Sequence, residues 1–140
     1  MNVRDVMTHN PRTVAPSDSI RIAARIMKDE DTGVVPVVEN GKPVGIVTDR
    51  DIVLRAVADG GSCDKPVREI ATLDLVFVKP GDSTREATRI MAERQIRRLP
   101  VIEDGRLVGI VSLGDIAVKE GQDSRTGETL EVISEGVKKH

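Results

Sequence analysis

Two segments of the sequence each place a hydroxyl group three residues before a carboxylate, at the end of an apolar run. Thr48 precedes Asp51 in the first segment, and Ser112 precedes Asp115 in the second. A carboxylate at a strand end can accept two hydrogen bonds from a cis-diol, and a neighbouring hydroxyl group can add another. A helix that begins there would also direct free backbone N–H groups at a nearby anion. These four residues are therefore candidates for binding a ligand that carries a ribose.

A structural role is the alternative, because the same spacing is that of a capping box at the start of a helix. A single occurrence would favour capping alone, whereas the duplication favours ligand binding, and the two roles are compatible. The glycines that precede the motif, Gly45 and Gly109, could let a ligand approach the backbone closely. If each motif also caps a helix, its mutation should cost about 1 kcal/mol of stability as well as binding.

The chain contains an internal repeat that covers most of its length. Pairs such as Pro36 and Pro100 are separated by 64 positions, and the two copies align without a gap. A Gly-rich, polar stretch between the copies is typical of a flexible loop. The predicted boundaries are 3–59 for the first repeat, 60–66 for the linker, 67–119 for the second repeat and 120–140 for a polar C-terminal tail.

Each repeat is predicted to fold in the order β-α-β-β-α. A short strand that a proline ends, at 13–16 or 76–80, comes first. In the helix that follows, Ser83 and Glu86 of the second copy have the spacing of a capping box. Apolar residues recur along one face of these helices, namely Ile20, Ala23, Ala24 and Met27 in the first copy and Ala87, Ile90 and Met91 in the second.

A β-hairpin and a second helix complete each repeat. The turns contain Asn40-Gly41 and Asp104-Gly105, whose residues readily adopt the positive φ that tight hairpins require. The second helix should begin near Asp51 or Asp115, with Ile52, Leu54 and Val57 on it in the first copy.

One repeat is too small to bury a core alone. We therefore predict an α/β (α+β) fold of two repeats related by pseudo-two-fold symmetry. The tail is either frayed or closes with an amphipathic turn that uses Leu130, Ile133 and Val137.

The composition restricts the possible functions. The net charge of −2 and the presence of one Phe, with no Trp or Tyr, make nucleic-acid binding unlikely. No apolar run is long enough to span a membrane, and no signal peptide precedes the first repeat. The single Cys63 allows no internal disulfide, which fits a cytoplasmic protein. There is no catalytic constellation, metal-ligand cluster or phosphate-binding loop, so an enzyme is not expected.

The repeated pattern of a proline-bearing strand, a hairpin and Gly-Ile-Val-[Thr/Ser]-x-x-Asp-Ile resembles that of a tandem pair of cystathionine β-synthase (CBS) domains, also called a Bateman module. The resemblance covers roughly residues 3–119, and the chain is similar to the small stand-alone CBS-pair proteins of bacteria and archaea. It implies clefts between the repeats that bind adenosyl ligands such as AMP, ADP, ATP or S-adenosylmethionine. It also implies a disc-like homodimer.

The resemblance assigns roles to further residues. Arg97 and Arg98 map onto positions that contact phosphate in related modules, and Arg50 is a further candidate that could instead pair with Asp49. Because Gly33 and Val34 replace the two arginines in the first repeat, we expect one phosphate-competent site and one weaker site, which is selective for uncharged adenosyl groups or empty. The adenine slot would be lined by Thr13, Val14, Val34, Val35, Pro36, Phe77, Val78, Leu99 and Pro100, each of which could instead be part of the core.

The predicted function is that of a non-catalytic regulatory module that binds an adenosyl ligand and senses energy or metabolic state, with a regulated protein as a possible partner. The alternative is a ligand-free dimeric interaction or scaffold protein that uses the same fold. Poor phosphate donors in the first copy favour this alternative, whereas Ser112, Asp115, Arg97 and Arg98 favour ligand binding.

Overall fold

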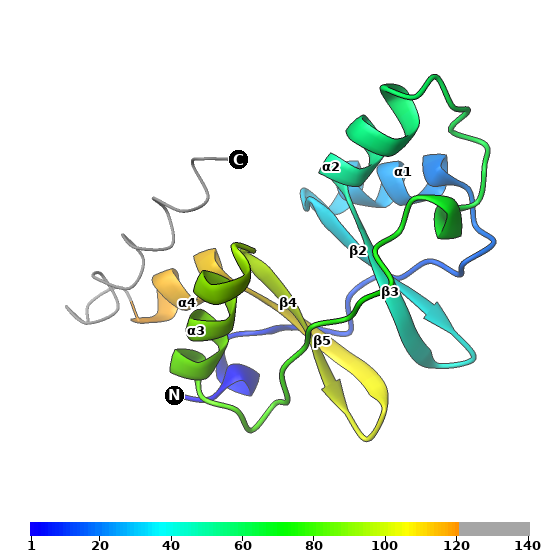
Figure 1. The fold of residues 1–140 in the computed structure, drawn as a ribbon. Coiled ribbons are helices and arrows are strands. Elements are labelled where there is room, and N and C mark those ends of the chain that lie inside the picture. The colour runs from blue at the N-terminus through cyan, green and yellow to red at the C-terminus, as the bar shows by residue number, and fades with distance from the viewer. Residues whose placement is uncertain (121–140) are drawn as a thin grey trace. The chain divides into compact units, whose positions relative to one another are not determined.

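The structure, a computed structural model, describes residues 1–120 and combines helices with short β-hairpins in an α+β fold, as predicted (Figure 1). The predicted amphipathic turn of the tail lies outside the described residues. In chain order, the elements are η1 (Val3–Asp5), β1 (Thr8–His9), α1 (Ile20–Glu30), β2 (Val34–Glu39), β3 (Lys42–Thr48), α2 (Asp49–Asp51), η2 (Ile52–Val57), η3 (Val67–Glu69), α3 (Thr84–Arg94), β4 (Arg98–Glu103), β5 (Arg106–Ser112) and α4 (Leu113–Glu120).

Both predicted hairpins are present, and their turns have the expected backbone. The φ angles are 53° at Asn40 and 79° at Gly41, and 53° at Asp104 and 76° at Gly105. Two successive positive φ angles give a turn whose twist matches that of the flanking strands. Strands β2 and β3 are antiparallel, with a register that places Val34 opposite Thr48. Strands β4 and β5 are likewise neighbours in a sheet, whose third strand is β1.

The predicted first strand of each repeat is reduced to a single bridge. Val14 forms a parallel bridge with Val37, and Val78 forms the equivalent bridge with Val101. The Val14 N–H donates to the carbonyl of Pro36 at 3.1 Å, and its carbonyl accepts from Val38 at 2.8 Å. Longer pairing is limited because the neighbouring prolines have no N–H to donate. The predicted first strand of each repeat is therefore shorter than expected.

Helix α1 buries Ile20, Ala23 and Met27 as predicted, together with Ile26, while Ala24 is only partly buried. The second helix of the first repeat differs from the expectation. It begins at Asp49 and continues from Ile52 to Val57 as a π-helix, in which the Ala58 N–H donates to the Val53 carbonyl at 2.9 Å. Leu54 and Val57 of this helix are exposed, whereas Ile52 is partly buried and packs against the core.

The described residues form two compact units, each with its own apolar core. The first-hairpin unit consists of Pro11–Leu75 together with Gly105–Leu107. The second-hairpin unit consists, among the described residues, of Met1–Asn10, Val76–Asp104 and 108–120. Apart from Gly105–Leu107 at the tip of the second hairpin, each unit therefore contains the helix and hairpin of one repeat, but the short segment that opens each repeat belongs to the other unit.

This exchange of opening segments is visible in the cores. Val3 and Val6 are buried with Met91 and Leu99 in the second-hairpin unit, although their sequence belongs to the first repeat. The Val3 N–H donates to the Asp82 carbonyl at 2.8 Å, which places η1 beside the start of α3 (Figure 1). Val67, Ile70 and Ala71 are correspondingly buried in the core of the first-hairpin unit. The packing units therefore differ from the sequence repeats at their opening segments.

The exchanged segments explain the two glycines that precede the hydroxyl–carboxylate motifs. A Cβ at Gly45 would lie 2.7 Å from the Thr72 carbonyl oxygen, and a Cβ at Gly109 would lie 2.7 Å from that of Thr8. The Ile46 N–H donates to the Thr72 carbonyl at 3.0 Å. Glycine is thus needed to let the exchanged backbone approach the strand. The structure gives these glycines this role instead of the predicted close approach of a ligand.

The predicted flexible linker is tied to helix α1. Carbonyl groups of Lys65 and Cys63 accept hydrogen bonds, each 2.9 Å long, from the N–H groups of Ile20 and Arg21. The first N–H groups of a helix have no partner within the helix, so the linker satisfies two of them. Residues 60–66 therefore belong to the first-hairpin unit and do not form a free spacer.

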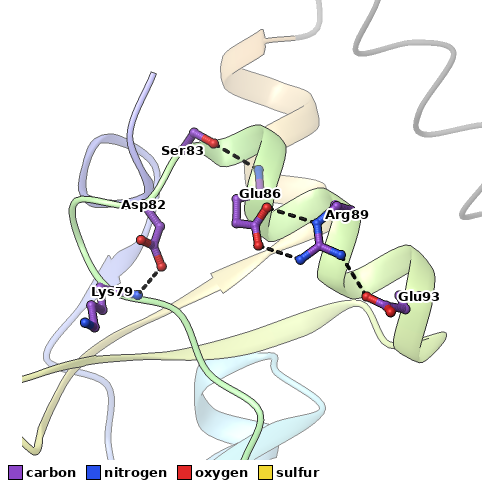
Figure 2. Close-up of polar contacts among 6 residues, drawn as sticks. All are labelled: Lys79, Asp82, Ser83, Glu86, Arg89 and Glu93. Atoms are coloured by element: carbon purple, nitrogen blue, oxygen red, sulfur yellow. Dashed lines mark hydrogen bonds and ion pairs between the residues drawn. The ribbon is translucent and has the colours of Figure 1, made fainter.

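Helix α3 has Ser83 as its N-cap, as predicted, but its expected capping box is only half formed. The Ser83 hydroxyl accepts from the Glu86 N–H at 3.0 Å. The Glu86 carboxylate turns away to Arg89, which donates to it at 2.6 and 3.0 Å and also donates to Glu93 at 2.9 Å (Figure 2). The hydrogen bond from Arg89, with its positive charge, lowers the pKa of Glu86 below the ordinary value.

This shift predicts a small acid dependence of stability. A carboxyl group whose pKa is lower in the folded chain stabilises the fold above its unfolded pKa of about 4.3, and that contribution is lost as the pH falls through the folded value. Because the Glu86 side chain is 42% exposed and solvent screens the ion pair, the effect should be slight. NMR titration of the Glu86 carboxyl carbon in the wild type and in Arg89→Gln checks this. Equal midpoints in the two proteins would contradict the assignment to Arg89.

Candidate functional site

The end of the first hairpin carries a complete capping box. The Asp51 N–H donates to the Thr48 hydroxyl at 3.0 Å, and the Thr48 N–H donates to the Asp51 carboxylate at 3.0 Å. Asp51 is also 3.9 Å from Arg55, and its side chain is only 11% exposed. The structural role of this pair is therefore confirmed. The Asp51 carboxylate is largely occupied by contacts within the protein.

The end of the second hairpin carries only half of this arrangement. The Asp115 N–H donates to the Ser112 hydroxyl at 3.0 Å. Within residues 1–120, the Asp115 carboxylate makes no hydrogen bond or ion pair, and its residue is partly exposed. The Ser112 hydroxyl accepts a bond and keeps its own proton to donate. Within residues 1–120, Asp115 thus has free capacity for a ligand that Asp51 largely lacks, whereas the Thr48 and Ser112 hydroxyl groups each accept one bond and can still donate.

This difference predicts unequal effects of removing the two carboxylates. Asp51→Ala breaks a reciprocal cap and should lower the free energy of unfolding by about 1–2 kcal/mol. Asp115→Ala removes only a favourable charge near a helix start and should cost about 0.5 kcal/mol. Urea denaturation of both variants measures this. Equal losses of stability would contradict the distinction between an occupied and a free carboxylate.

Two arginines lie at the same end of the second hairpin as Ser112. Strand β4 begins at Arg98 and its antiparallel neighbour β5 ends at Ser112, while the Leu113 N–H donates to the Arg97 carbonyl at 2.8 Å. Arg97 is exposed and Arg98 is partly exposed. Neither guanidinium group contacts an acidic side chain or a carbonyl in the described part of the chain. The fold therefore places two cations, which have no acidic partner among residues 1–120, at the same hairpin end as Ser112 and Asp115.

Arg50, the third predicted phosphate residue, lies on the other unit. It is exposed, and its backbone N–H donates to the Asp49 carboxylate at 2.8 Å. The first hairpin end has Gly33 and Val34 where the second has Arg97 and Arg98. Asp49, which follows Thr48 directly, was not among the predicted site residues. The signal that would have identified it is the difference between the repeats, since the second repeat has Leu113 at this position.

The predicted adenine-slot residues divide into two groups. Core packing occupies the side chains of Val14 and Val35 in one unit and of Val78 and Leu99 in the other. Val34, Pro36 and Pro100 are buried as well, whereas Thr13 and Phe77 are exposed. Thr13 and Phe77 occupy equivalent positions, directly before the bridging valines. Of the nine candidates, these two have side chains that a ligand can reach without displacing the core.

The described residues offer little support for other kinds of site. No group of three or more His, Cys, Asp or Glu in residues 1–120 could hold a metal ion. None of the helices in this part of the chain is long and apolar enough to cross a membrane.

Comparison with known proteins identifies the repeat. The sequence pattern of the CBS domain matches residues 3–57 and again residues 67–119. The chain belongs to the CBS-domain family. The two matches make it a tandem CBS pair, which confirms the resemblance and the α+β fold expected from the sequence.

Relatives of this CBS pair include proteins of similar length and structures with ligands. The CBS domain-containing protein YhcV of Bacillus subtilis is 44% identical over 133 residues, which cover 95% of each chain. The CBS domain pair of protein MJ0100, solved in complex with 5′-methylthioadenosine and S-adenosyl-L-methionine, is 31% identical with a TM-score of 0.79, covering 87% of this chain and 97% of that one. CBSX2, solved in complex with AMP, is 28% identical with a TM-score of 0.75, covering 86% and 96%.

Proposed function

We propose that this CBS pair is a non-catalytic regulatory module that binds an adenosyl ligand and reports on energy or metabolic state. The observation that carries the proposal is the group of polar side chains at the end of the second hairpin that keep hydrogen-bonding capacity within residues 1–120. Asp115 and Ser112 provide an acceptor pair for the ribose diol, while Arg97 and Arg98 provide donors for phosphate. The ligands named for MJ0100 and CBSX2 are of this chemical class.

The two hairpin ends are proposed to differ in what they bind. The second, with two guanidinium groups that contact no acidic side chain within residues 1–120, suits a phosphorylated ligand such as AMP, ADP or ATP. The first lacks these donors, and its carboxylate is engaged by Thr48 and Arg55. A ligand that binds one arrangement of the protein better than another shifts the chain toward that arrangement, which is how binding would be transmitted to a regulated partner.

A protein-interaction role is the second candidate, and one surface feature favours it. Val53, Leu54 and Val57 on η2 are 55%, 47% and 61% exposed. Apolar side chains gathered on one exposed helix are typical of a surface that contacts another protein. We propose that this surface contributes to a homodimer or to a complex with a regulated protein. A purely structural, ligand-free scaffold would use this surface and leave the second hairpin end unused.

Thermal unfolding with added ligands tests the proposed function. Adenosyl compounds at about 100 times their dissociation constant should stabilise the protein by about 2.7 kcal/mol. AMP, ADP, ATP and S-adenosylmethionine are the probes, and guanosine monophosphate is the control for nonspecific effects of phosphate. Mass spectrometry of small molecules released from the purified protein is an independent measurement. If no adenosyl compound at millimolar concentration raises the melting temperature, the scaffold function is favoured.

A further inference from the structure

The two hairpin ends share one backbone arrangement. In the first, the Asp49 N–H donates to the Gly33 carbonyl at 3.0 Å, and in the second the Leu113 N–H donates to the Arg97 carbonyl at 2.8 Å. These residues are equivalent pairs in the repeat. The side chains nevertheless have opposite character, because a glycine and an acidic residue in one copy replace a basic residue and an apolar residue in the other.

The Asp49 carboxylate fills the space in which the side chain of residue 33 would begin. A Cβ at Gly33 would lie 2.9 Å from Asp49 Oδ2 and 3.2 Å from both Oδ1 and Cγ. The Arg50 N–H donates to Oδ1 at 2.8 Å, which helps to hold the carboxylate in this direction. Glycine at position 33 therefore leaves room for an acidic group where the other repeat has the stem of Arg97.

The second repeat arranges the same positions in the opposite way. Leu113 is only 7% exposed and packs in the core of its unit. The exposed side chain of this residue pair is therefore that of Arg97. The charges around the two positions differ accordingly. The first hairpin end has two carboxylates, those of Asp49 and Asp51, beside Arg50 and Arg55, whereas Arg97 and Arg98 outnumber Asp115 at the second. Arg55 lies against Asp51 and not against Asp49.

We propose that Asp49 is a specificity-determining residue that excludes phosphorylated ligands from the first hairpin end and favours adenosyl compounds with a neutral or cationic substituent. A carboxylate placed where the equivalent site offers a guanidinium group repels a phosphate and attracts a positive centre, such as a sulfonium. The inference rests on the proposed function, since it names the ligand class of one of its two sites. It extends that function by attributing the selectivity of the first hairpin end against phosphate to the Asp49 carboxylate, as well as to the absence of arginines at positions 33 and 34.

Calorimetric titration with AMP, adenosine and S-adenosylmethionine tests this. Arg97→Ala with Arg98→Ala is the background, so that the second hairpin end no longer favours phosphate. In this background, Asp49→Asn should raise the affinity for AMP and lower that for S-adenosylmethionine, each by about three- to tenfold, and should leave adenosine unchanged. Adding Gly33→Arg with Asp49→Leu, which copies the second repeat, should make AMP the preferred ligand.

A matched control and the salt dependence make the result specific. Asp59→Asn removes the same charge from an exposed position of the same unit and should leave all three affinities unchanged. The effect of Asp49→Asn should shrink as ionic strength rises. An unchanged ratio of AMP to S-adenosylmethionine affinity in Asp49→Asn would overturn this inference and leave the proposed function intact. Failure of the wild-type chain to bind any of the three compounds would overturn both.

Discussion

Val3→Asp is expected to unfold the second-hairpin unit, although Val3 belongs to the first repeat in sequence. Its side chain is fully buried against that unit's core. An unpaired carboxylate there should cost at least about 3 kcal/mol, a large part of the stability of a small domain. Hydrogen exchange should show loss of amide protection in α3 and β4, with α1 and β2 affected less.

The same substitution at an exposed valine is the control. Val118→Asp changes a side chain that is 86% exposed on α4 and should alter the unfolding free energy by less than about 0.5 kcal/mol. If Val3→Asp instead removed protection from α1 and β2 while α3 and β4 stayed protected, each opening segment would pack with its own repeat. The exchange of segments between units would then be wrong.

Replacing Arg97 and Arg98 together with Ala should weaken AMP binding by about 10- to 100-fold. Within residues 1–120 neither guanidinium group contacts an acidic side chain, so each can donate charge-assisted hydrogen bonds to phosphate oxygens. Hydrogen bonds to charged groups contribute about 1.5–3 kcal/mol apiece, and solvent screening reduces this at an exposed site. Adenosine has no phosphate, so its affinity should change little. Titration calorimetry with both compounds measures the difference.

The matched control removes two other arginines from the same unit. Arg85 and Arg94 are exposed on helix α3, so Arg85→Ala with Arg94→Ala changes the net charge equally without touching the hairpin end. A comparable loss of AMP affinity in this control would indicate a general effect of charge and not direct contact. An equal loss of AMP and adenosine affinity in the first double variant would also contradict the phosphate role.

Much of the local structure follows from the sequence because it depends on short-range chemistry. Asn40-Gly41 and Asp104-Gly105 determine the hairpin turns through the positive φ angles that these residues tolerate. Ser83 and Thr48 mark helix starts through side-chain caps. The regular spacing of the two copies identified a CBS pair, and the sequence pattern of that family matches both copies.

Other features could not be predicted, because they depend on contacts between distant parts of the chain. The packing of Val3 with the second repeat and of Val67 with the first is invisible to a self-comparison, which aligns each segment with its own copy. The need for glycine at positions 45 and 109 arises from the same exchanged segments. Local spacing suggested a ligand approach at these glycines, whereas the tertiary structure places a backbone carbonyl there.

The candidate site shows the same division. The sequence by itself determined that a hydroxyl and a carboxylate occur twice and that only the second copy has two arginines directly before the proline-bearing strand of its hairpin. Only the tertiary structure decided that the Asp51 carboxylate is engaged, and that the Asp115 carboxylate is free within residues 1–120. It also showed that the Asp49 carboxylate lies against Gly33. The physical reason is that residue types set which interactions are possible, whereas the packing of strands and helices decides which partners each side chain meets.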